Sequence, residues 1–419
     1  MNDRSDHVVV VGGGVIGAMC AWYLQQSGHQ VTIVDSDRFG AGCSHGNCGY
    51  VCPSHVLPLP GPGAIGSAFK AMLQPNSALK IKPRLSLDFW NWFLRFSQHC
   101  NRSDMLFSAR ARHALLDSSM RLYLDFIEDE GIQCEWESKG LLFVFATKKG
   151  FEHYAATNRL LSDELGVQAV SYDTDQLARL EPALKPNLGG AWHYEGDCHL
   201  RPDLFMSQLR QRLEGKGVRI VENSAVSEFK STNSLVQAVI TQNAEFEAAQ
   251  VVVATGAWAP FLNDQLGCRI PIQPGKGYSI TGKRPAITPQ IPLIFEEHRV
   301  AVTPMQSGYR IGSTMEFAGY DTSINRKRLE LLKKGAQFYL REPHPQTIDE
   351  EWFGWRPMTW DGLPIIDKSP RFSNVWIAAG HNMLGLSMAT GTGRLVQELI
   401  DEQQPHIDPS PYSFKQKNL

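Results

Sequence analysis

The sequence has no long apolar run, no strong net charge and no closely paired cysteines. No uninterrupted apolar stretch is long enough to cross a bilayer, so we predict no membrane-spanning helix. The formal net charge is −2 and long basic runs are absent, which argues against nucleic acid as a main partner. The N-terminus is polar and soon enters an apolar run at Val8, so we expect no signal peptide and a cytoplasmic location.

Eight cysteines are scattered along the 419 residues without a Cys-x-x-Cys pair. This usage is typical of reduced thiols in a cytosolic protein. Cys43, Cys48 and Cys52 do cluster, and iron–sulfur ligation is the alternative interpretation. Their spacing differs from the ferredoxin patterns and no fourth ligand is nearby, so we predict no metal site.

A glycine-rich motif near the N-terminus is the most informative feature that is present. Two apolar runs flank Gly12-Gly13-Gly14-Val15-Ile16-Gly17 and a helical segment, and the second run ends on Asp35. Gly12 allows a tight turn, Gly14 lets the backbone approach a pyrophosphate, and Gly17 lets helix and strand pack closely. The helix N-terminus then faces the phosphates, and Asp35 stands where a carboxylate would bind ribose hydroxyls. The pattern predicts an adenine-dinucleotide site but leaves FAD and NAD open.

A second loop of small residues follows, from Phe39 to Gly49. Such density of small residues suits a backbone that lies against a flat ligand and donates N–H groups to it. Helical patterning dominates from Leu87 to Glu130, short alternating runs predict an antiparallel meander at 225–248, and a helix is expected over 386–400.

Strands and helices of the nucleotide-binding type return in three separated segments. At this length we expect two domains. We therefore predict an α/β protein with α+β elements, in which residues 1–80, 196–265 and 350–419 form a discontinuous dinucleotide domain. Residues 81–195 and 266–349 form an inserted substrate-binding (cap) domain with a mixed sheet. A chain interrupted in this way is unusual for a simple NAD dehydrogenase and usual for flavin enzymes.

Taken together, these segments resemble the D-amino acid oxidase-like superfamily of FAD-dependent oxidoreductases over nearly the whole chain. The branch they resemble most is the bacterial D-amino acid dehydrogenases. The motifs that carry this resemblance are Ala254–Trp258, Gly275–Ser279, Val300–Pro304 with Glu316, Trp355–Thr359, Asp361–Pro364, Gly380–Ser387 and Ala389–Gly393.

The resemblance implies a Rossmann-type FAD domain of the glutathione-reductase-like kind. It also implies noncovalent FAD, because in relatives that attach flavin covalently the histidine falls one position after His45. Val226 stands where relatives place backbone atoms against adenine. The residues that we expect to bind the cofactor are Gly12, Gly14, Val15, Ile16, Gly17, Asp35, Ser36, Cys43, Ser44, His45, Asn47, Gly49, Val226, Thr255, Gly256, Trp258, Gly385, Leu386 and Ser387.

Flavin-dependent amine oxidation limits what the protein must supply. Enzymes that resemble this one use no side-chain base and aim the α-carbon hydrogen at flavin N5. They need a clamp for the substrate carboxylate and donors for the negative charge that develops on the reduced flavin. Gly385-Leu386-Ser387, expected to open the last helix, suits the donor role. For the clamp we consider Tyr278, Arg356 and His381, with Tyr278 preferred, because Met305 replaces the arginine of glycine oxidase-like relatives.

Three functions stay open at this stage. The first is an FAD-dependent D-amino acid dehydrogenase, including forms that act on cyclic imino acids such as D-proline or D-hydroxyproline, with electrons passed to a quinone or an electron-transfer partner. The second is a glycine- or sarcosine-type oxidase that releases hydrogen peroxide. The third is a flavoprotein subunit that transfers electrons within a larger complex.

The segment Leu85–Phe96 is aromatic on most of its circumference. One interpretation is a helix buried against the substrate domain. The other is a surface for peripheral membrane association, on the inner face of the cell membrane, or for an electron-accepting partner.

Overall fold

The computed structural model describes residues 6–73, 77–82 and 86–417. Its first sheet has six strands, and the first of them, β1 (His7–Val11), runs parallel to both its neighbours. β1 and β2 are joined by α1 (Val15–Gln26), so the predicted strand–turn–helix–strand unit is confirmed. Only the edge strand β19 is antiparallel to its neighbour. The strand order is β19 (Ile365–Lys368), β20 (Val375–Ala379), β13 (Gln250–Val253), β1, β2 (Gln30–Val34) and β9 (Arg219–Val221).

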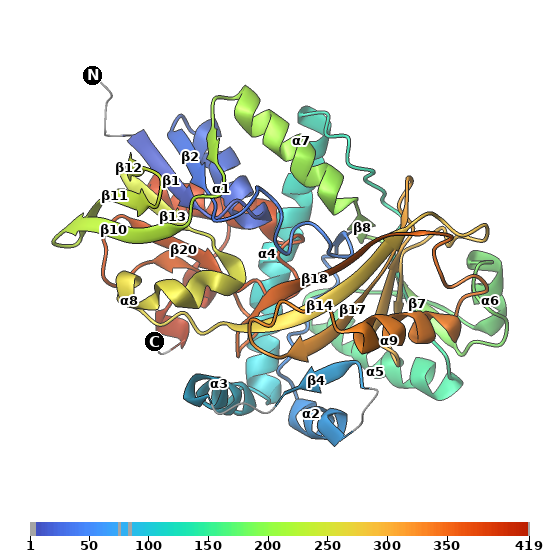
Figure 1. Ribbon diagram of the computed structural model, residues 1–419. Helices are drawn as coiled ribbons and strands as arrows, with labels where there is room; N and C mark the ends of the chain where they lie inside the picture. The colour runs from blue at the N-terminus through green and yellow to red at the C-terminus, as the bar shows by residue number, and fades with distance from the viewer. Residues whose placement is uncertain (1–5, 74–76, 83–85, 418–419) are drawn as a thin grey trace.

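Helices from distant parts of the chain cover this sheet (Figure 1). Their buried side chains belong to one core cluster, which includes Met19, Leu115, Phe205 and Leu395. α4 and α10 are also joined by a hydrogen bond of 2.7 Å between Ser119 and Thr390. The helices are α1, α4 (Arg102–Asp129), α7 (Pro202–Gly215) and α10 (Ala389–Ile400).

A three-stranded antiparallel sheet lies beside the first sheet and confirms the predicted meander. It consists of β10 (Val226–Thr232), β11 (Leu235–Thr241) and β12 (Glu245–Glu247). The 3-10 helix η2 (Gly256–Leu262) and the short α8 (Asn263–Leu266) follow β13.

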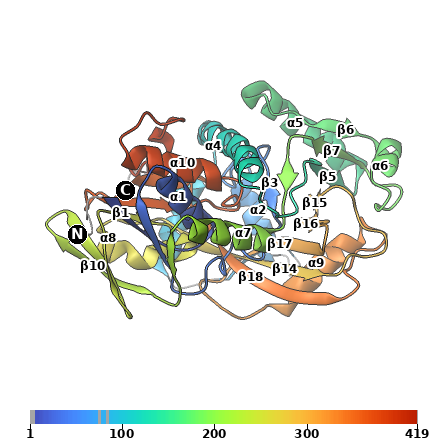
Figure 2. The ribbon, with the colours of Figure 1, turned by 90° about the horizontal axis from the view of Figure 1, so that it is seen from above.

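A mixed nine-stranded sheet forms the other half of the molecule, as Figures 1 and 2 show. The long strands β14 and β18 are antiparallel neighbours and run from this sheet toward the first. The path is β18 (Ile348–Met358), β14 (Gln273–Gly282), β17 (Tyr309–Phe317), β16 (Val300–Thr303), β15 (Leu293–Phe295), β5 (Leu141–Phe145), β7 (Gly190–Tyr194) and β6 (Val170–Tyr172), with β4 (Leu79–Ile81) paired to β17. The helices α5 (Lys148–Leu165), α6 (Thr174–Leu180) and α9 (Arg326–Gln337) and the two-stranded pair β3 (Tyr50–Val51) and β8 (Cys198–His199) complete this half.

The helical region predicted from Leu87 to Glu130 is interrupted. α3 (Leu87–Gln98) ends before α4 begins, because the Asn101 side chain accepts a hydrogen bond from Asp104 N–H and caps a new helix. A further helix, α2 (Ala64–Leu73), for which we made no prediction, precedes this region. Leu85, in the predicted aromatic segment, lies outside the described residues.

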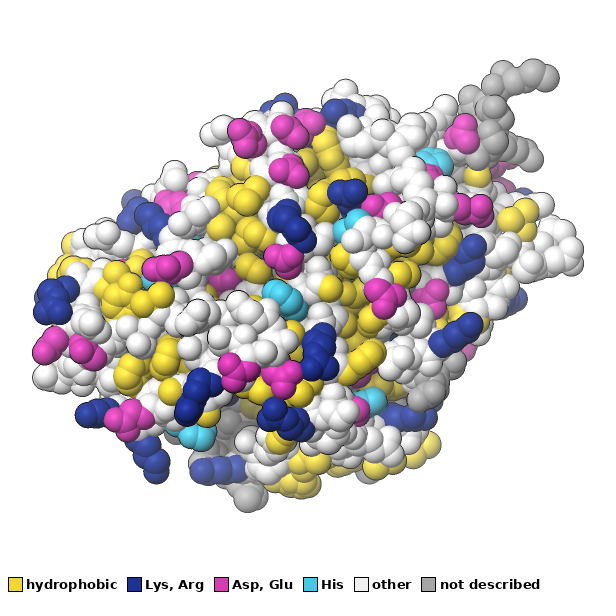
Figure 3. All heavy atoms as spheres, turned by 180° about the vertical axis from the view of Figure 1, so that it is seen from behind, with side chains coloured by type: hydrophobic (Ala, Val, Ile, Leu, Met, Phe, Trp, Pro, Cys, Tyr) yellow, Lys and Arg dark blue, Asp and Glu magenta, His cyan; other side chains and the backbone are white. Residues whose placement is uncertain are grey.

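The predicted boundary at residue 350 falls inside β18, and α4, from the range predicted for the inserted domain, packs on α10. Among the described residues, no helix is both long enough and apolar enough to cross a membrane. Over the face shown in Figure 3, cationic and anionic side chains are interspersed, with apolar side chains between them.

Candidate active site

A cavity of about 750 Å³ lies between the two large sheets, a size typical of cofactor and substrate sites. Its walls come from the turn before α1, the loop over residues 35–49, η2, β14, β18 and the segment 378–386. Of the residues predicted from sequence, those that line it are Gly12, Gly14, Val15, Ile16, Asp35, Ser36, Cys43, Ser44, Asn47, Gly49, Val226, Thr255, Gly256, Trp258, Tyr278, Arg356, His381, Gly385 and Leu386.

The turn before α1 leaves no room for side chains. Gly12 has φ +110°, and a Cβ atom there would lie 2.6 Å from the carbonyl oxygen of Ala254. A Cβ atom on Gly17 would lie 1.9 Å from the carbonyl oxygen of Gly12, so Gly17 serves helix–strand packing and does not line the cavity. The N-cap residue of α1 is Gly14, which has no side chain, and the first turn of the helix holds no acidic residue, so the positive end of the helix dipole favours an anionic ligand there.

Asp35 and Ser44 fix the glycine turn from both sides. Asp35 Oδ2 accepts a hydrogen bond of 2.6 Å from Gly13 N–H, and Ser44 Oγ accepts one of 2.9 Å from Val15 N–H. Burial raises the pKa of Asp35 above its ordinary value. A half-buried carboxylate of this kind gains from further donors such as ribose hydroxyls.

The loop over residues 45–48 is held by three side chains of the nine-stranded sheet. Arg310 Nη1 donates to the Asn47 carbonyl at 2.7 Å and to the His45 carbonyl at 3.3 Å. Ser279 donates to the Gly46 carbonyl at 2.8 Å, and Thr303 to the Cys48 carbonyl at 2.6 Å. We did not predict these three residues from the sequence. The feature that could have identified them is a polar residue within an otherwise apolar strand.

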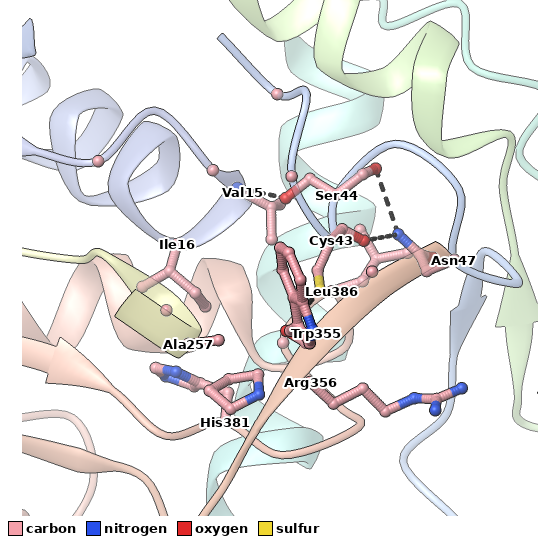
Figure 4. Close-up of a pocket in the computed structure, with 18 of the residues that line it drawn as sticks. Val15, Ile16, Cys43, Ser44, Asn47, Ala257, Trp355, Arg356, His381 and Leu386 are labelled. Carbon is pink, nitrogen blue, oxygen red and sulfur yellow. Dashed lines mark hydrogen bonds between the residues drawn. The ribbon is translucent and has the colours of Figure 1, made fainter. Parts of the chain in front are cut away.

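Arg356 is a partly buried cation without a carboxylate partner among the described residues. Its Nη1 donates to the Thr314 carbonyl at 2.8 Å, and burial lowers its pKa from the ordinary value. A Cβ atom on Gly277 would lie 2.3 Å from this Nη1, so the guanidinium lies over backbone that only glycine leaves open. Figure 4 shows Arg356 and His381 extending in opposite directions below Trp355. The geometry therefore leaves Arg356 free to bind an anionic ligand group.

Tyr278 and His381 are instead engaged within the protein. Tyr278 is 2% exposed and its hydroxyl donates to Glu316 Oε2 at 2.8 Å. This geometry does not support the prediction that the phenol binds a substrate carboxylate, although the residue lines the cavity. His381 Nε2 lies 3.0 Å from Thr392 Oγ1, and burial lowers the pKa of His381 to about 3, which keeps the ring neutral.

Besides Gly17, two predicted cofactor contacts do not line the cavity, His45 and Ser387. His45 Nε2 pairs with Glu350 at 2.8 Å. Residues 385–388 form a turn ahead of α10, which begins at Ala389, so Ser387 does not open the helix as expected. Its hydroxyl donates to the Tyr50 carbonyl at 2.9 Å and accepts from Cys52 N–H at 3.2 Å.

Cys52 and His55, which line the cavity, form a polar cluster with Asp197, and potential ligand atoms of the three residues lie within 4.8 Å of one another. Sequence reasoning missed this cluster because Asp197 comes from a distant turn. Asp197 accepts two hydrogen bonds from Ser54, at 3.1 Å to Oδ1 and 2.5 Å to Oδ2. Burial raises the pKa of Asp197 to about 7. The carboxyl group is thus satisfied by Ser54 and fixes the loop that carries Cys52 and His55.

Buried donors without partners show where a cofactor fits. Trp355 Nε1 and Thr255 Oγ1 are enclosed, have no hydrogen-bond partner, and belong to residues that line the cavity. An unpaired buried polar atom costs about 1–3 kcal/mol, so a ligand that supplies the partner is favoured. With the open helix N-terminus and Asp35, these groups match a bound dinucleotide.

The fold and cavity thus define a dinucleotide-dependent enzyme of mixed α/β architecture. Residues 7–399 match the family model described as "DAO: FAD dependent oxidoreductase", and the chain belongs to this family. The cofactor is therefore FAD, as predicted.

Curated relatives and solved structures match almost end to end. The chain is 32% identical to a D-amino acid dehydrogenase of Vibrio atlanticus (strain LGP32), covering 97% of this chain and 99% of the relative. It is 29% identical to one of Granulibacter bethesdensis, over 96% and 97%. A glycine oxidase structure from Geobacillus kaustophilus has a TM-score of 0.78 at 21% identity over 97% and 98% of the two chains. An L-proline dehydrogenase structure from P. horikoshii has 0.74 at 19%, over 99% and 98%. At these identities the two structures show the fold alone.

We predict that Asp35→Ala weakens FAD binding roughly 10- to 100-fold, as expected for loss of about 1.5–3 kcal/mol from a charge-assisted hydrogen bond. Asp35→Asn retains an acceptor for Gly13 N–H and should show a smaller loss. FAD affinity is measured by titration of the apoprotein, with Asp129→Ala as a control that removes an exposed charge away from the cavity. Equal affinities of the native and Asp35→Ala proteins would contradict the ribose assignment.

Proposed function

We propose that the protein is an FAD-dependent D-amino acid dehydrogenase that also accepts cyclic imino acids such as D-proline or D-hydroxyproline. The observation that carries this proposal is the partly buried Arg356 guanidinium, which lines the cavity and has no acidic partner among the described residues. An α-carboxylate would supply that partner. The relatives named D-amino acid dehydrogenase support the same substrate class. We also infer a glutathione-reductase-like FAD domain with the nine-stranded sheet contributed mainly by an inserted domain.

The residues suggest how this reaction is supported. Bound FAD would accept the α-carbon hydride at N5. Arg356 would hold the substrate carboxylate and so orient the α-carbon hydrogen. The backbone N–H groups of Gly385 and Leu386, ahead of α10, would stabilise negative charge that develops on reduction. His381 is neutral and hydrogen-bonded to Thr392, so it would hold the cavity segment 378–386 in place and would not transfer a proton.

We propose that FAD is held noncovalently. His45 does not line the cavity, and the Cys43 thiol donates to the Trp355 carbonyl at 2.7 Å. Burial raises the pKa of Cys43 to about 12, so the nucleophilic thiolate is disfavoured.

The proposal is tested by mixing the holoenzyme with single amino acids without oxygen and following flavin bleaching. We expect D-amino and D-imino acids, and not their L-enantiomers, to bleach the flavin, with reoxidation by a dye much faster than by air. Bleaching by glycine or sarcosine with peroxide formation in air would favour the oxidase alternative. If no amine reduces the flavin unless a partner protein is added, the result would favour the alternative of an electron-transfer subunit.

We predict that Arg356→Lys raises the substrate KM roughly 10- to 100-fold, because lysine lacks the bidentate fork and a charged hydrogen bond contributes about 1.5–3 kcal/mol. Tyr278→Phe is the matched comparison, since it removes only the hydroxyl that donates to Glu316. It should leave KM within about twofold. The assignment is wrong if steady-state kinetics with the dye acceptor give the opposite ranking.

The exposed face of α3 supports a second proposal, peripheral attachment to the inner face of the cell membrane. One face of α3 packs against the protein, because Phe89, Trp92 and Phe96 are buried. Leu87 and Leu94 nevertheless remain 84% and 57% exposed on the same helix. A helix with an exposed apolar face of this kind suits the membrane interface.

We predict that the protein sediments with lipid vesicles and that the double change Leu87→Ser and Leu94→Ser removes most of this binding. Each substitution removes a leucine side chain whose full insertion into the membrane would contribute about 1.5–3 kcal/mol to binding. Leu235→Ser, at a leucine 47% exposed on β11, is the control. Failure of the native protein to bind vesicles, or equal loss with Leu235→Ser, would refute the attachment.

A further inference from the structure

A second cavity, of about 550 Å³, lies between β4, the end of β17 and the first turns of α9. In the described part of the chain, no residue lines both this cavity and the cofactor cavity. Its lining is strongly cationic, with two acidic residues, Glu316 and Glu330, against six basic ones. The basic residues are Lys80, Lys82, Arg326, Lys327, Arg328 and Lys334.

Both acidic residues of this cavity already have partners. Glu316 is 2% exposed, its Oε2 accepts a hydrogen bond of 2.8 Å from the Tyr278 hydroxyl, and its Oε1 lies 3.7 Å from Lys82 Nζ. Glu330 lies 3.1 Å from Lys333, which does not line the cavity. The carboxylates therefore leave most of the positive charge of the lining uncompensated.

Four of the basic residues form no salt bridge with the described residues. Three are lysines, Lys80, Lys327 and Lys334, and the fourth is Arg328, which is only 4% exposed. Arg328 Nη1 donates a hydrogen bond of 2.5 Å to the Ser77 carbonyl, and burial lowers the pKa of Arg328 from its ordinary value. Because burial disfavours the charged guanidinium, an anion beside it would stabilise the folded protein.

The N-terminus of α9 adds to the positive potential. Asn325 accepts a hydrogen bond of 3.2 Å from Lys327 N–H and caps the helix, and the first turn holds no acidic residue. Lys327 and Lys334 are two turns apart on one face of α9, which corresponds to roughly 10 Å along the helix axis. Lys80 lies on β4, opposite Glu316 in the strand pairing. The cations are thus spread over a length that a single phosphate group does not cover.

We propose that this cavity binds a ligand with more than one phosphate group. Lysine ammonium groups bind phosphate oxygens as point charges, and the arginine guanidinium binds them through paired donors. A soluble condensed phosphate and a lipid with two phosphates, such as cardiolipin, present the same chemistry. Ile81 of β4 belongs to the same core cluster as Phe89 of α3, so the cavity adjoins the helix that we propose to meet the membrane. The inference does not depend on the proposed dehydrogenase reaction.

The test for a soluble ligand is calorimetric titration of tripolyphosphate into the holoenzyme, in which FAD already occupies the other phosphate-binding site. We expect saturable binding. Lys327→Ala combined with Lys334→Ala should weaken it about tenfold, as expected for two lysine–phosphate contacts at a partly exposed site. The matched control is Lys148→Ala combined with Lys149→Ala, which removes two exposed charges on α5, outside the cavity. It should change the affinity less than twofold.

Lys80→Ala is an independent variant from a different element, and it keeps the test decisive if the double variant of α9 is unstable. It should weaken tripolyphosphate binding in the same direction. Unchanged flavin absorbance and melting temperature show that a variant has kept its fold. Sulfate, titrated in the same way, measures general attraction of anions and should bind much more weakly than tripolyphosphate.

The lipid source is tested by sedimentation of the holoenzyme with phosphatidylcholine vesicles that contain cardiolipin, or phosphatidylglycerol at equal total charge. A preference for cardiolipin that the Lys327→Ala and Lys334→Ala changes remove would identify the lipid as the ligand. Tripolyphosphate binding without that preference would identify a soluble ligand. The proposal is refuted if the native protein shows neither, if sulfate binds as tightly as tripolyphosphate, or if the cavity variants behave as the α5 control. Vesicle binding through α3 alone would appear separately, as binding to pure phosphatidylcholine.

Discussion

The loop over residues 40–49 is held by α1 on one side and by the nine-stranded sheet on the other, and the cavity between the two large sheets depends on this attachment. On one side Ser44 bonds to the first turn of α1. On the other, Arg310, Ser279 and Thr303 donate to four successive carbonyl groups of the loop. Carbonyl oxygens that are satisfied by side chains need no backbone partner, so the loop keeps an irregular path while buried. Because the loop is fixed, the glycine turn before α1 and the strand β18 lie on opposite sides of the same cavity.

The elements that depend on local sequence were predictable. The strand, glycine turn, helix and strand that end at Asp35 follow from spacing alone, because only glycine tolerates the contact between residues 12 and 254. The meander at 226–247 followed from alternation in the same way. Most of the predicted cofactor residues line one cavity for this reason.

Long-range pairings were not predictable from spacing. Tyr278 had the position expected of a substrate ligand, but its hydroxyl meets Glu316 on the neighbouring strand. Arg356 was one of three clamp candidates, and only the surrounding structure shows that no acid in the described part of the chain pairs with it. The break between α3 and α4 was also missed, although its signal is local: the Asn101 side chain accepts from Asp104 N–H and begins a new helix. For Tyr278 and Arg356, the role of the side chain depends on which groups lie next to it in the folded chain, and spacing along the sequence does not show this.

The order of strands in the first sheet has a consequence for biosynthesis. β1 lies in the middle of the sheet and is made first, yet its neighbour β13 is about 240 residues away, and β20 and β19 come from the last part of the chain. Pairings over such separations form slowly. A nascent chain therefore carries the glycine turn long before the ribosome supplies Ala254 and Leu386 to close the pocket. Cofactor capture is then a late event, which would make holoenzyme yield sensitive to the FAD supply at chain release.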